Sequence, residues 1–146
     1  MKNFILLFCI ATCLSCSTKL DQSKADIIGC WELAAIDGAN DHDIINYINY
    51  SDQSAINYWG ANTEYGFLMS SSEIRYELKL DADENILLNV YSEMDTTISK
   101  IAIIENSTLD CTVLNSDKTW SFKKIEQSKL DSIISSAIDP SQFNGY

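Results

Sequence analysis

The sequence has few of the side chains that catalysis and metal binding commonly use. Its one histidine, His42, lies in a polar segment, so a histidine-based metal cluster is excluded and a Ser/His/Asp triad cannot be argued. Asp81 and Asp83 resemble the opening of a calcium loop, but Ile86 and Ser92 stand where that loop needs glycine and glutamate. A hairpin turn is therefore predicted there. We expect no enzyme activity, no catalytic residue, no metal site and no cofactor.

Basic side chains are also scarce. Ten lysines and arginines stand against 21 aspartates and glutamates, which gives a formal net charge of −11. A surface this acidic repels phosphate backbones and anionic lipid headgroups. We therefore expect no nucleic-acid partner. The charge suits an exported protein that must stay in solution, or a protein with a basic partner.

The N-terminus has the form of an export signal. Lys2 precedes an apolar run over residues 4–10, which is too short to span a bilayer as a permanent helix. The stretch resembles a bacterial lipoprotein signal, which is cleaved before a cysteine that is then acylated, for instance with palmitate. Cys16 is the lipidation site that we favour. Cleavage before Cys13, or secretion without a lipid, remains an alternative.

The next ten residues are polar and show no periodicity, which is typical of a tether between an anchor and a folded domain. The length that remains suits one domain with a real core, and not two. We therefore divide the chain into a signal peptide at 1–15, a polar tether at 16–26 and a single domain at 27–146.

The first apolar run of that domain, residues 27–36, alternates between two faces. Gly29, Trp31 and Leu33 share one face, and Cys30 lies on the other. A period of two is typical of a half-buried strand. Trp31 is therefore predicted to point inward and to anchor the core.

Further strands follow in the sequence. After a turn at 37–40, Asp41 and Asp43 are expected to cap a short helix, and the aromatic segment 47–65 is expected to form a long, partly ordered lid or cap. Alternating residues then predict strands at 65–70, 74–80, 86–91, 97–104, 109–114 and 119–125. Short polar turns between them indicate an antiparallel meander. Closure into a barrel would cover its two edges.

The tail of the domain changes to a helical period. An apolar stripe at i, i+3, i+4 and i+7 predicts an amphipathic helix between Ser128, as N-cap, and Pro140. The stripe consists of Leu130, Ile133, Ile134 and Ala137. We expect this helix to pack on the outside of the sheet or to plug one end of it.

The domain has two cysteines, Cys30 and Cys111. An oxidising compartment favours a disulfide between them. Cys30, however, faces away from Trp31, whereas Cys111 shares a face with Leu109 and Val113, and two cysteines must face the same way to pair on adjoining strands. One disulfide and two separate buried thiols are both open at this point.

The motif Gly-x-Trp, formed by Gly29, Cys30 and Trp31, resembles that of the lipocalin superfamily, a branch of the calycins. With the meander that follows, the chain looks most like the small lipocalin-like lipoproteins of Gram-negative bacteria, loosely over residues 27–125. The resemblance implies an all-β, roughly eight-stranded antiparallel barrel with a C-terminal amphipathic helix. It also implies that Trp31 closes the base of the barrel against Lys123 or Lys124. The Thr-Asp-Tyr segment of that family is absent.

This resemblance further implies a lipid-anchored protein of the cell envelope, at the outer membrane, which binds a small apolar or amphipathic ligand without catalysis. An interior filled by its own side chains is the other outcome that a barrel of this size allows. A second hypothesis is an acidic exported inhibitor or immunity-type protein, which binds a protein partner. For the first hypothesis, the expected ligand-binding residues are Trp31, Phe67, Tyr76, Leu78, Val90 and Phe122.

Overall fold

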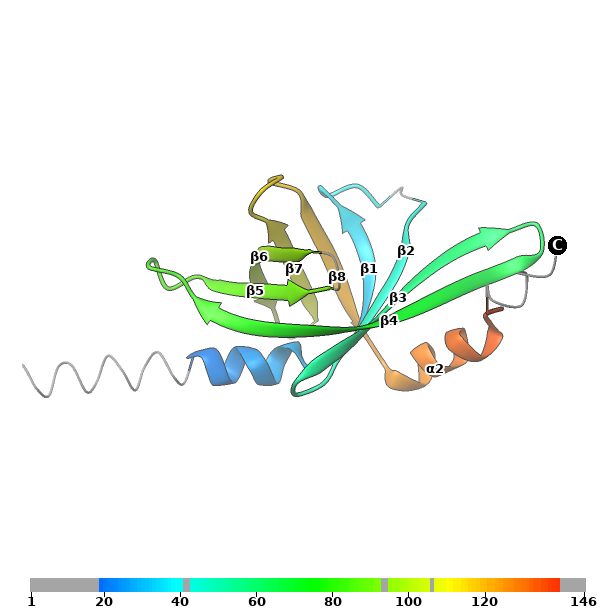
Figure 1. The fold of residues 1–146 in the computed structure, drawn as a ribbon, viewed down its shortest axis with the longest axis horizontal. Coiled ribbons are helices and arrows are strands. Elements are labelled where there is room, and N and C mark those ends of the chain that lie inside the picture. Colours follow the sequence, from blue (N-terminus) through cyan, green and yellow to red (C-terminus); the bar gives the residue numbers. More distant parts are fainter. Residues whose placement is uncertain (1–18, 41–42, 93–94, 106, 140–146) are drawn as a thin grey trace, which may run out of the picture.

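The computed structural model describes residues 19–40, 43–92, 95–105 and 107–139. The expected signal peptide, Cys13, Cys16 and His42 lie outside the described residues. A helix over residues 19–27 comes first, and α2 (Gln127–Ser136) comes last (Figure 1). Between them lie β1 (Gly29–Ile36), β2 (Ile45–Tyr50), β3 (Ser54–Thr63), β4 (Gly66–Leu80), β5 (Ile86–Tyr91), β6 (Thr96–Ile104), β7 (Thr108–Val113) and β8 (Thr119–Ile125).

The eight strands form a closed barrel in chain order. Each strand pairs antiparallel with the next, and β8 pairs with β1 through Trp31↔Lys124 and Leu33↔Phe122. Closure leaves no row of backbone donors and acceptors unpaired at an edge. The predicted fold class, an all-β eight-stranded antiparallel barrel with a C-terminal helix, is confirmed.

The early strands differ from those expected. The segment predicted as a lid, 47–65, instead supplies most of β2 and all of β3, and β2 stands where a short helix was expected. The strands predicted at 65–70 and 74–80 are one continuous strand of 15 residues, β4. With β3 it forms a long hairpin, whose register runs from Ser54↔Arg75 to Thr63↔Gly66. The barrel therefore has the eight strands that were expected, but β2 and β3 are additional strands and β4 combines two predicted ones.

The lid was predicted wrongly because β2 is covered on both faces, whereas β3 has exposed apolar residues on both faces, Ile56 on the outside and Trp59 at the barrel mouth. Tyr50 and Ala55 point into the barrel, whereas Tyr47 and Tyr58 point outward and pack under α2. A strand that is buried on both faces shows no alternation of apolar and polar residues. The aromatic segment therefore lacked the period that identified the later strands.

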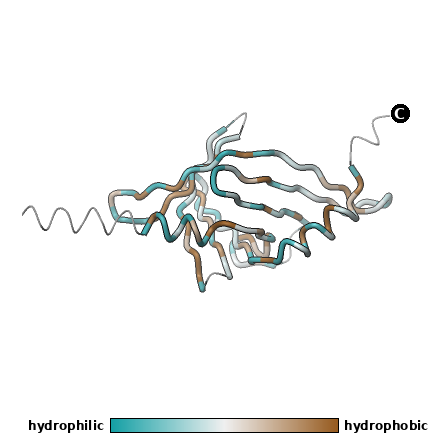
Figure 2. Tube along the Cα trace, turned by 90° about the horizontal axis from the view of Figure 1, so that it is seen from below, coloured by the Kyte–Doolittle hydropathy of each residue, from teal (hydrophilic) through white to brown (hydrophobic). Residues whose placement is uncertain are grey.

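The main core fills the lower part of the barrel. Its buried side chains come from the inward positions of the strands, and the apolar positions recur at intervals along the chain trace (Figure 2). This cluster includes Trp31, Leu33, Ile48, Tyr50, Ile74, Leu88, Ile101, Leu109 and Phe122. The inward prediction for Trp31 is confirmed, since its side chain is fully buried.

A second, smaller core lies on the outside of the barrel, beneath α2. Leu130 is fully buried there among Cys30, Tyr47 and Met69. The amphipathic helix thus packs on the outer face of β1 to β4, which is one of the two placements that its apolar stripe predicts. The N-cap is Glu126, which makes no side-chain capping hydrogen bond, and not Ser128.

Residues 19–27 form a helix where an irregular tether was expected. Leu20, Ser23 and Ile27 share one face of it, and Ile27 is fully buried in the main core. Only two apolar side chains mark that face, which is too few for a visible period. The helix covers the base of the barrel, the end where β1 begins and β8 ends.

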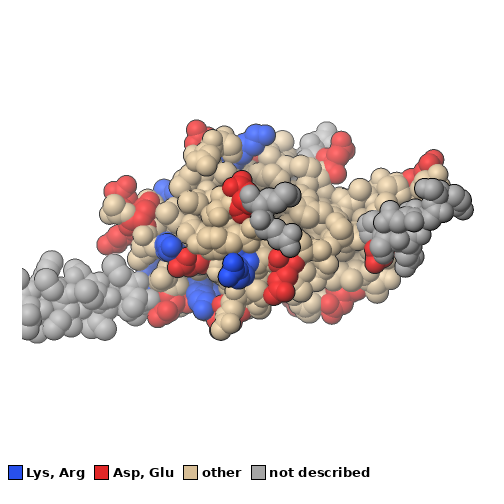
Figure 3. All heavy atoms as spheres, in the orientation of Figure 1, with Lys and Arg blue, Asp and Glu red and all other residues tan. Residues whose placement is uncertain are grey.

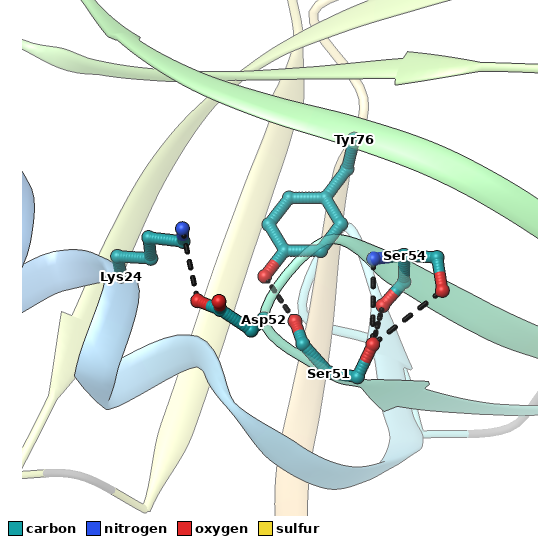
Figure 4. A network of polar contacts seen from close by, with 5 residues as sticks. All are labelled: Lys24, Ser51, Asp52, Ser54 and Tyr76. Carbon is teal, nitrogen blue, oxygen red and sulfur yellow. Dashed lines mark hydrogen bonds and ion pairs between the residues drawn. The ribbon is translucent and has the colours of Figure 1, made fainter.

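Polar contacts accompany this closure of the base (Figure 4). Lys24 pairs with Asp52 at 2.9 Å, and the hydroxyl of Tyr76 donates a hydrogen bond to the carbonyl oxygen of Ser51 at 2.5 Å. The side chains of Lys24 and Asp52 are 44% and 72% exposed, so water screens their ion pair and it adds little to stability. Burial of Ile27 therefore holds the helix in place more firmly than this pair does.

The closed base predicts a large stability cost for one substitution. Trp31→Ala removes a fully buried indole and should lower the free energy of unfolding by about 3–5 kcal/mol. Urea denaturation followed by circular dichroism measures this change. Trp59→Ala is the matched control, because Trp59 is 42% exposed and should cost clearly less. Equal losses for the two variants would contradict the structural role of Trp31.

Candidate ligand-binding cavity

The upper part of the barrel interior is hollow, with a cavity of about 410 Å³. Seven of the eight strands, all but β1, contribute to its wall. Its apolar lining consists of Ile48, Tyr50, Trp59, Ile74, Leu88, Val90, Val113, Trp120 and Phe122. Its other lining residues are Asn46, Asn57, Thr97, Ser99, Cys111, Ser116 and Lys118. A hollow of this volume is within the range of small-molecule sites.

The cavity is closed below and open above. Tyr50, Leu88 and Phe122 are buried at its floor, whereas Trp59 and Lys118 are exposed at its upper rim. The upper rim lies at the end of the barrel opposite the helix 19–27. A molecule would therefore enter past the turn over residues 114–118 and the upper part of β3.

Two tryptophans stand at this mouth. The rings of Trp59 and Trp120 meet edge to face, with centroids 6.2 Å apart and an interplanar angle of 87°. Trp59 is directly opposite Asn46 on β2, and Trp120 is opposite Cys111 on β7. Edge-to-face aromatic pairs are favourable beyond their buried area, so the pair makes a preformed apolar rim.

One wall of the cavity carries a buried amide. Asn46 is 3% exposed, and its side-chain nitrogen donates to Asn57 Oδ1 at 2.6 Å and to the carbonyl oxygen of Tyr58 at 2.9 Å. Because these hydrogen bonds satisfy the Asn46 nitrogen inside the protein, the amide is held in one orientation. The wall thus combines apolar rings with fixed polar groups.

Trp31 lies below the cavity floor and does not line it. Its Nε1 donates to the carbonyl oxygen of Ile27 at 2.7 Å, and Lys124 Nζ lies 5.1 Å from the ring centroid, in cation–π range. Lys124 also donates to the carbonyl oxygen of Asp26 at 3.2 Å. Of the two lysines expected against Trp31, Lys124 is therefore the partner. Lys123 lies opposite Glu32 in the register of β1 and β8.

The other residues predicted to contact a ligand are divided among three places. Val90 and Phe122 line the cavity. Tyr76 and Leu78 lie at the base, beside the helix 19–27. Phe67 was expected inside the barrel, and this was wrong: it lies on the outer face, packed in the cluster beneath α2.

The error for Phe67 follows from the length of β4. In one unbroken strand, side chains alternate without a change of phase, so the inward positions Ile74 and Tyr76 place every odd-numbered residue outward. Two separate strands, as predicted, would have allowed Phe67 to face inward. Trp59 and Trp120 were not predicted as site residues. Trp120 alternates with Phe122 in a predicted strand, and this signal was sufficient to find it.

The two cysteines are both free and buried, so of the two possibilities that the sequence left open, two separate buried thiols are found and a disulfide is not. Cys111 lines the cavity, whereas Cys30 lies on the outer face beneath α2, where its thiol donates to Gln127 Oε1 at 2.9 Å. The wall of the barrel separates them. Burial raises the pKa of the Cys30 thiol and raises the pKa of the Cys111 thiol to about 12, so both are protonated at neutral pH.

Other hollows lie outside the barrel. One of them, about 480 Å³, lies between α2 and the strands β1 and β2, and the side chains of Glu32, Tyr47 and Ile133 form part of it. Glu32 is already paired there with Lys129 at 2.6 Å. We regard the barrel cavity as the candidate site, because it combines a buried apolar floor with a defined mouth.

The described part of the chain contains neither a metal-binding cluster nor a membrane-spanning helix. No three histidine, cysteine, aspartate or glutamate side chains within it are placed to hold a metal ion. None of its helices has the length and the apolar character needed to cross a bilayer.

Known proteins that match this chain were found by structure and not by sequence. No protein-family model matches the chain, and no curated protein matches it by sequence. Among solved structures, lobster apocrustacyanin A1 is a match, with a TM-score of 0.42 and 8% identity. The similarity covers 82% of this chain and 73% of the crustacyanin chain. At this level it says nothing of what the chain binds, and the barrel assignment rests on the strand pairing itself.

The raised pKa of Cys111 predicts a loss of stability in alkali. Below pH 9 the thiol is protonated in both the folded and the unfolded state. Between pH 9 and 12 only the unfolded state ionises, so the free energy of unfolding should fall as the pH rises. From pH 9 to 11, Cys111→Ala should reduce that fall by on the order of 2 kcal/mol, as measured by urea denaturation.

Cys30→Ala is the matched control for this experiment. It removes the other thiol, whose pKa is also raised but which lies outside the barrel, and it should change the pH dependence less. The pKa of Tyr50 is raised well above its usual value by burial and, to a smaller extent, by the neighbouring Cys111 thiol, so Tyr50 lowers the stability of all three proteins at high pH. Parallel curves for wild type and Cys111→Ala would contradict the prediction.

Proposed function

We propose that this protein binds a small apolar or amphipathic molecule in the barrel cavity and does not alter it chemically. The observation that carries the proposal is the hollow of about 410 Å³ above a buried apolar floor. Each Å² of apolar surface that a ligand buries there contributes roughly 25 cal/mol. The rings of Trp59 and Trp120 offer such surface at the mouth.

Binding without catalysis agrees with the chemistry of the lining. No aspartate, glutamate or histidine among the described residues lines the cavity. General acid–base catalysis needs such groups within hydrogen-bond reach of a bound substrate. The thiol of Cys111 is a poor nucleophile at neutral pH, because its pKa is raised to about 12.

The second hypothesis, an acidic inhibitor of a basic protein, has less support. An inhibitor of that kind needs a solid core and a concentrated acidic surface. The upper interior is hollow, and on the face shown in Figure 3 the acidic side chains are spread over the molecule with lysines among them. We therefore prefer ligand binding.

We further propose that acylated Cys16 anchors the protein in the cell envelope, at the outer membrane of a Gram-negative bacterium. Support comes from the sequence of the signal and from its distance to the fold. Two residues lie between Cys16 and Lys19, the first described residue of the N-terminal helix. That helix covers the base, so an anchor there would hold the base toward the membrane and the cavity mouth away from it.

A larger side chain in the cavity should weaken the binding of a small amphiphile. Val90→Phe places a larger side chain in the cavity and should weaken binding of decanol at least about tenfold, since overpacking costs 1–3 kcal/mol. Quenching of tryptophan fluorescence during titration measures the affinity. Leu87→Phe is the matched control, because Leu87 lies on the same strand and faces outward, opposite Lys79 and Lys100.

Two results would reject the ligand-binding proposal. One is that wild-type protein binds neither decanol nor other small amphiphiles. The other is that Val90→Phe, folded as judged by circular dichroism, binds as well as wild type. Native mass spectrometry of protein purified from its own host should also show a mass that is lost on denaturation.

The anchor is tested by its cysteine. Cys16→Ala should prevent incorporation of labelled palmitate and move the protein from the membrane fraction to the soluble fraction. Cys13→Ala is the matched control and should leave both properties unchanged. If the Cys16→Ala variant still incorporates palmitate, the lipidation site is elsewhere.

A further inference from the structure

The cavity differs in charge from the rest of the chain. The sequence has 21 acidic residues and 10 lysines and arginines, yet the one charged side chain among the described residues that line the cavity is a lysine, Lys118. In the whole chain, with its net charge of −11, acidic residues outnumber basic ones, whereas the described lining of the cavity has no acidic residue. The described lining therefore carries one positive charge and no negative charge.

Lys118 is held at the rim by its backbone. Its carbonyl oxygen accepts a hydrogen bond from the Val113 N–H at 2.9 Å, and this bond closes the turn over residues 114–117. Val113 N–H thereby ties Lys118 to the upper end of β7, directly before β8 begins at Thr119. The position of the ammonium group near the mouth therefore follows from the strand pairing.

Among the described residues, the ammonium group of Lys118 has neither an ion-pair partner nor a side-chain hydrogen bond. The nearby carboxylate of Asp37 instead accepts a hydrogen bond from the Thr119 N–H at 2.8 Å. The charge of Lys118 is thus available to a bound molecule.

The floor has the opposite character. Below the rim the cavity narrows to buried Tyr50, Leu88 and Phe122, which offer apolar surface and no charge. An apolar body in this lower part would project one end past the tryptophan pair toward Lys118. A carboxylate at that end would receive charge-assisted hydrogen bonds from an ammonium group.

We propose that the ligand is an amphipathic anion, with its apolar body on the floor of the cavity and its carboxylate at Lys118. This inference rests on the proposed ligand-binding function and narrows it to one chemical class. Because Lys118 is exposed, the gain from the charge is moderate, and we expect a carboxylate to bind about fivefold tighter than the matching alcohol.

The test compares two probes of one chain length, decanoate below its critical micelle concentration and decanol below its solubility limit in water. Tryptophan fluorescence measures their dissociation constants at pH 7.5 and about 0.15 M salt, where the repulsion from distant acidic groups is screened beyond about 8 Å. Wild type should prefer decanoate. Lys118→Gln should lose that preference by binding decanoate less tightly, with its affinity for decanol unchanged.

Two further variants complete the experiment. Lys100→Gln removes an exposed lysine from the outer face of β6, opposite Leu87, and should keep the preference of wild type for decanoate. Lys118→Glu reverses the charge at the rim and should bind decylammonium more tightly than decanoate. All variants alter exposed side chains, so we expect them to fold as wild type does. An unchanged midpoint of thermal unfolding verifies this.

The outcomes separate the two proposals. If neither probe binds to wild type, the ligand-binding function itself is rejected. If decanol and decanoate bind equally well, or if Lys118→Gln keeps the preference for decanoate, ligand binding stands and the anionic class is overturned. Loss of the preference in Lys118→Gln alone supports the assignment of the carboxylate to Lys118.

Discussion

The closed base of the barrel, centred on Trp31, is the constraint on which the rest of the structure depends. Its indole is fully buried, donates to the carbonyl oxygen of Ile27 and lies under the ammonium group of Lys124. These contacts join the helix 19–27, the first strand and the last strand at one point. Since β1 and β8 close the barrel there, the cavity above has a floor only because this junction is filled.

The two helices serve the barrel in different ways. The helix 19–27 covers the base through Ile27, while α2 covers the outer face of β1 to β4 through Leu130. The wall beneath α2 is therefore buried on both faces. Cys30 and Cys111, which lie on opposite faces of the barrel wall, show how this separation keeps chemically similar groups apart.

The division of the interior into a filled lower part and a hollow upper part is what makes a binding function plausible for so small a domain. Bulky side chains pack the base, but toward the mouth Ser99, Thr97 and Ser116 take inward positions and leave space. The mouth then combines an aromatic pair with a lysine that has no partner among the described residues. This arrangement is the basis on which we propose an amphipathic anion as the ligand.

The sequence by itself determined the strands from β5 to β8, the inward position of Trp31 and the amphipathic helix, because in each case one face is apolar and the other polar. It also limited the basic partner of Trp31 to two adjacent lysines. Tertiary structure decided the nature of β2 and β3, the outward position of Phe67 and the separation of the two thiols. Burial on both faces of β2, and exposed apolar residues on both faces of β3, remove the period from the sequence, and the phase of a strand depends on where it begins. The cavity, too, is set by how side chains from seven strands meet in space, which no local pattern contains.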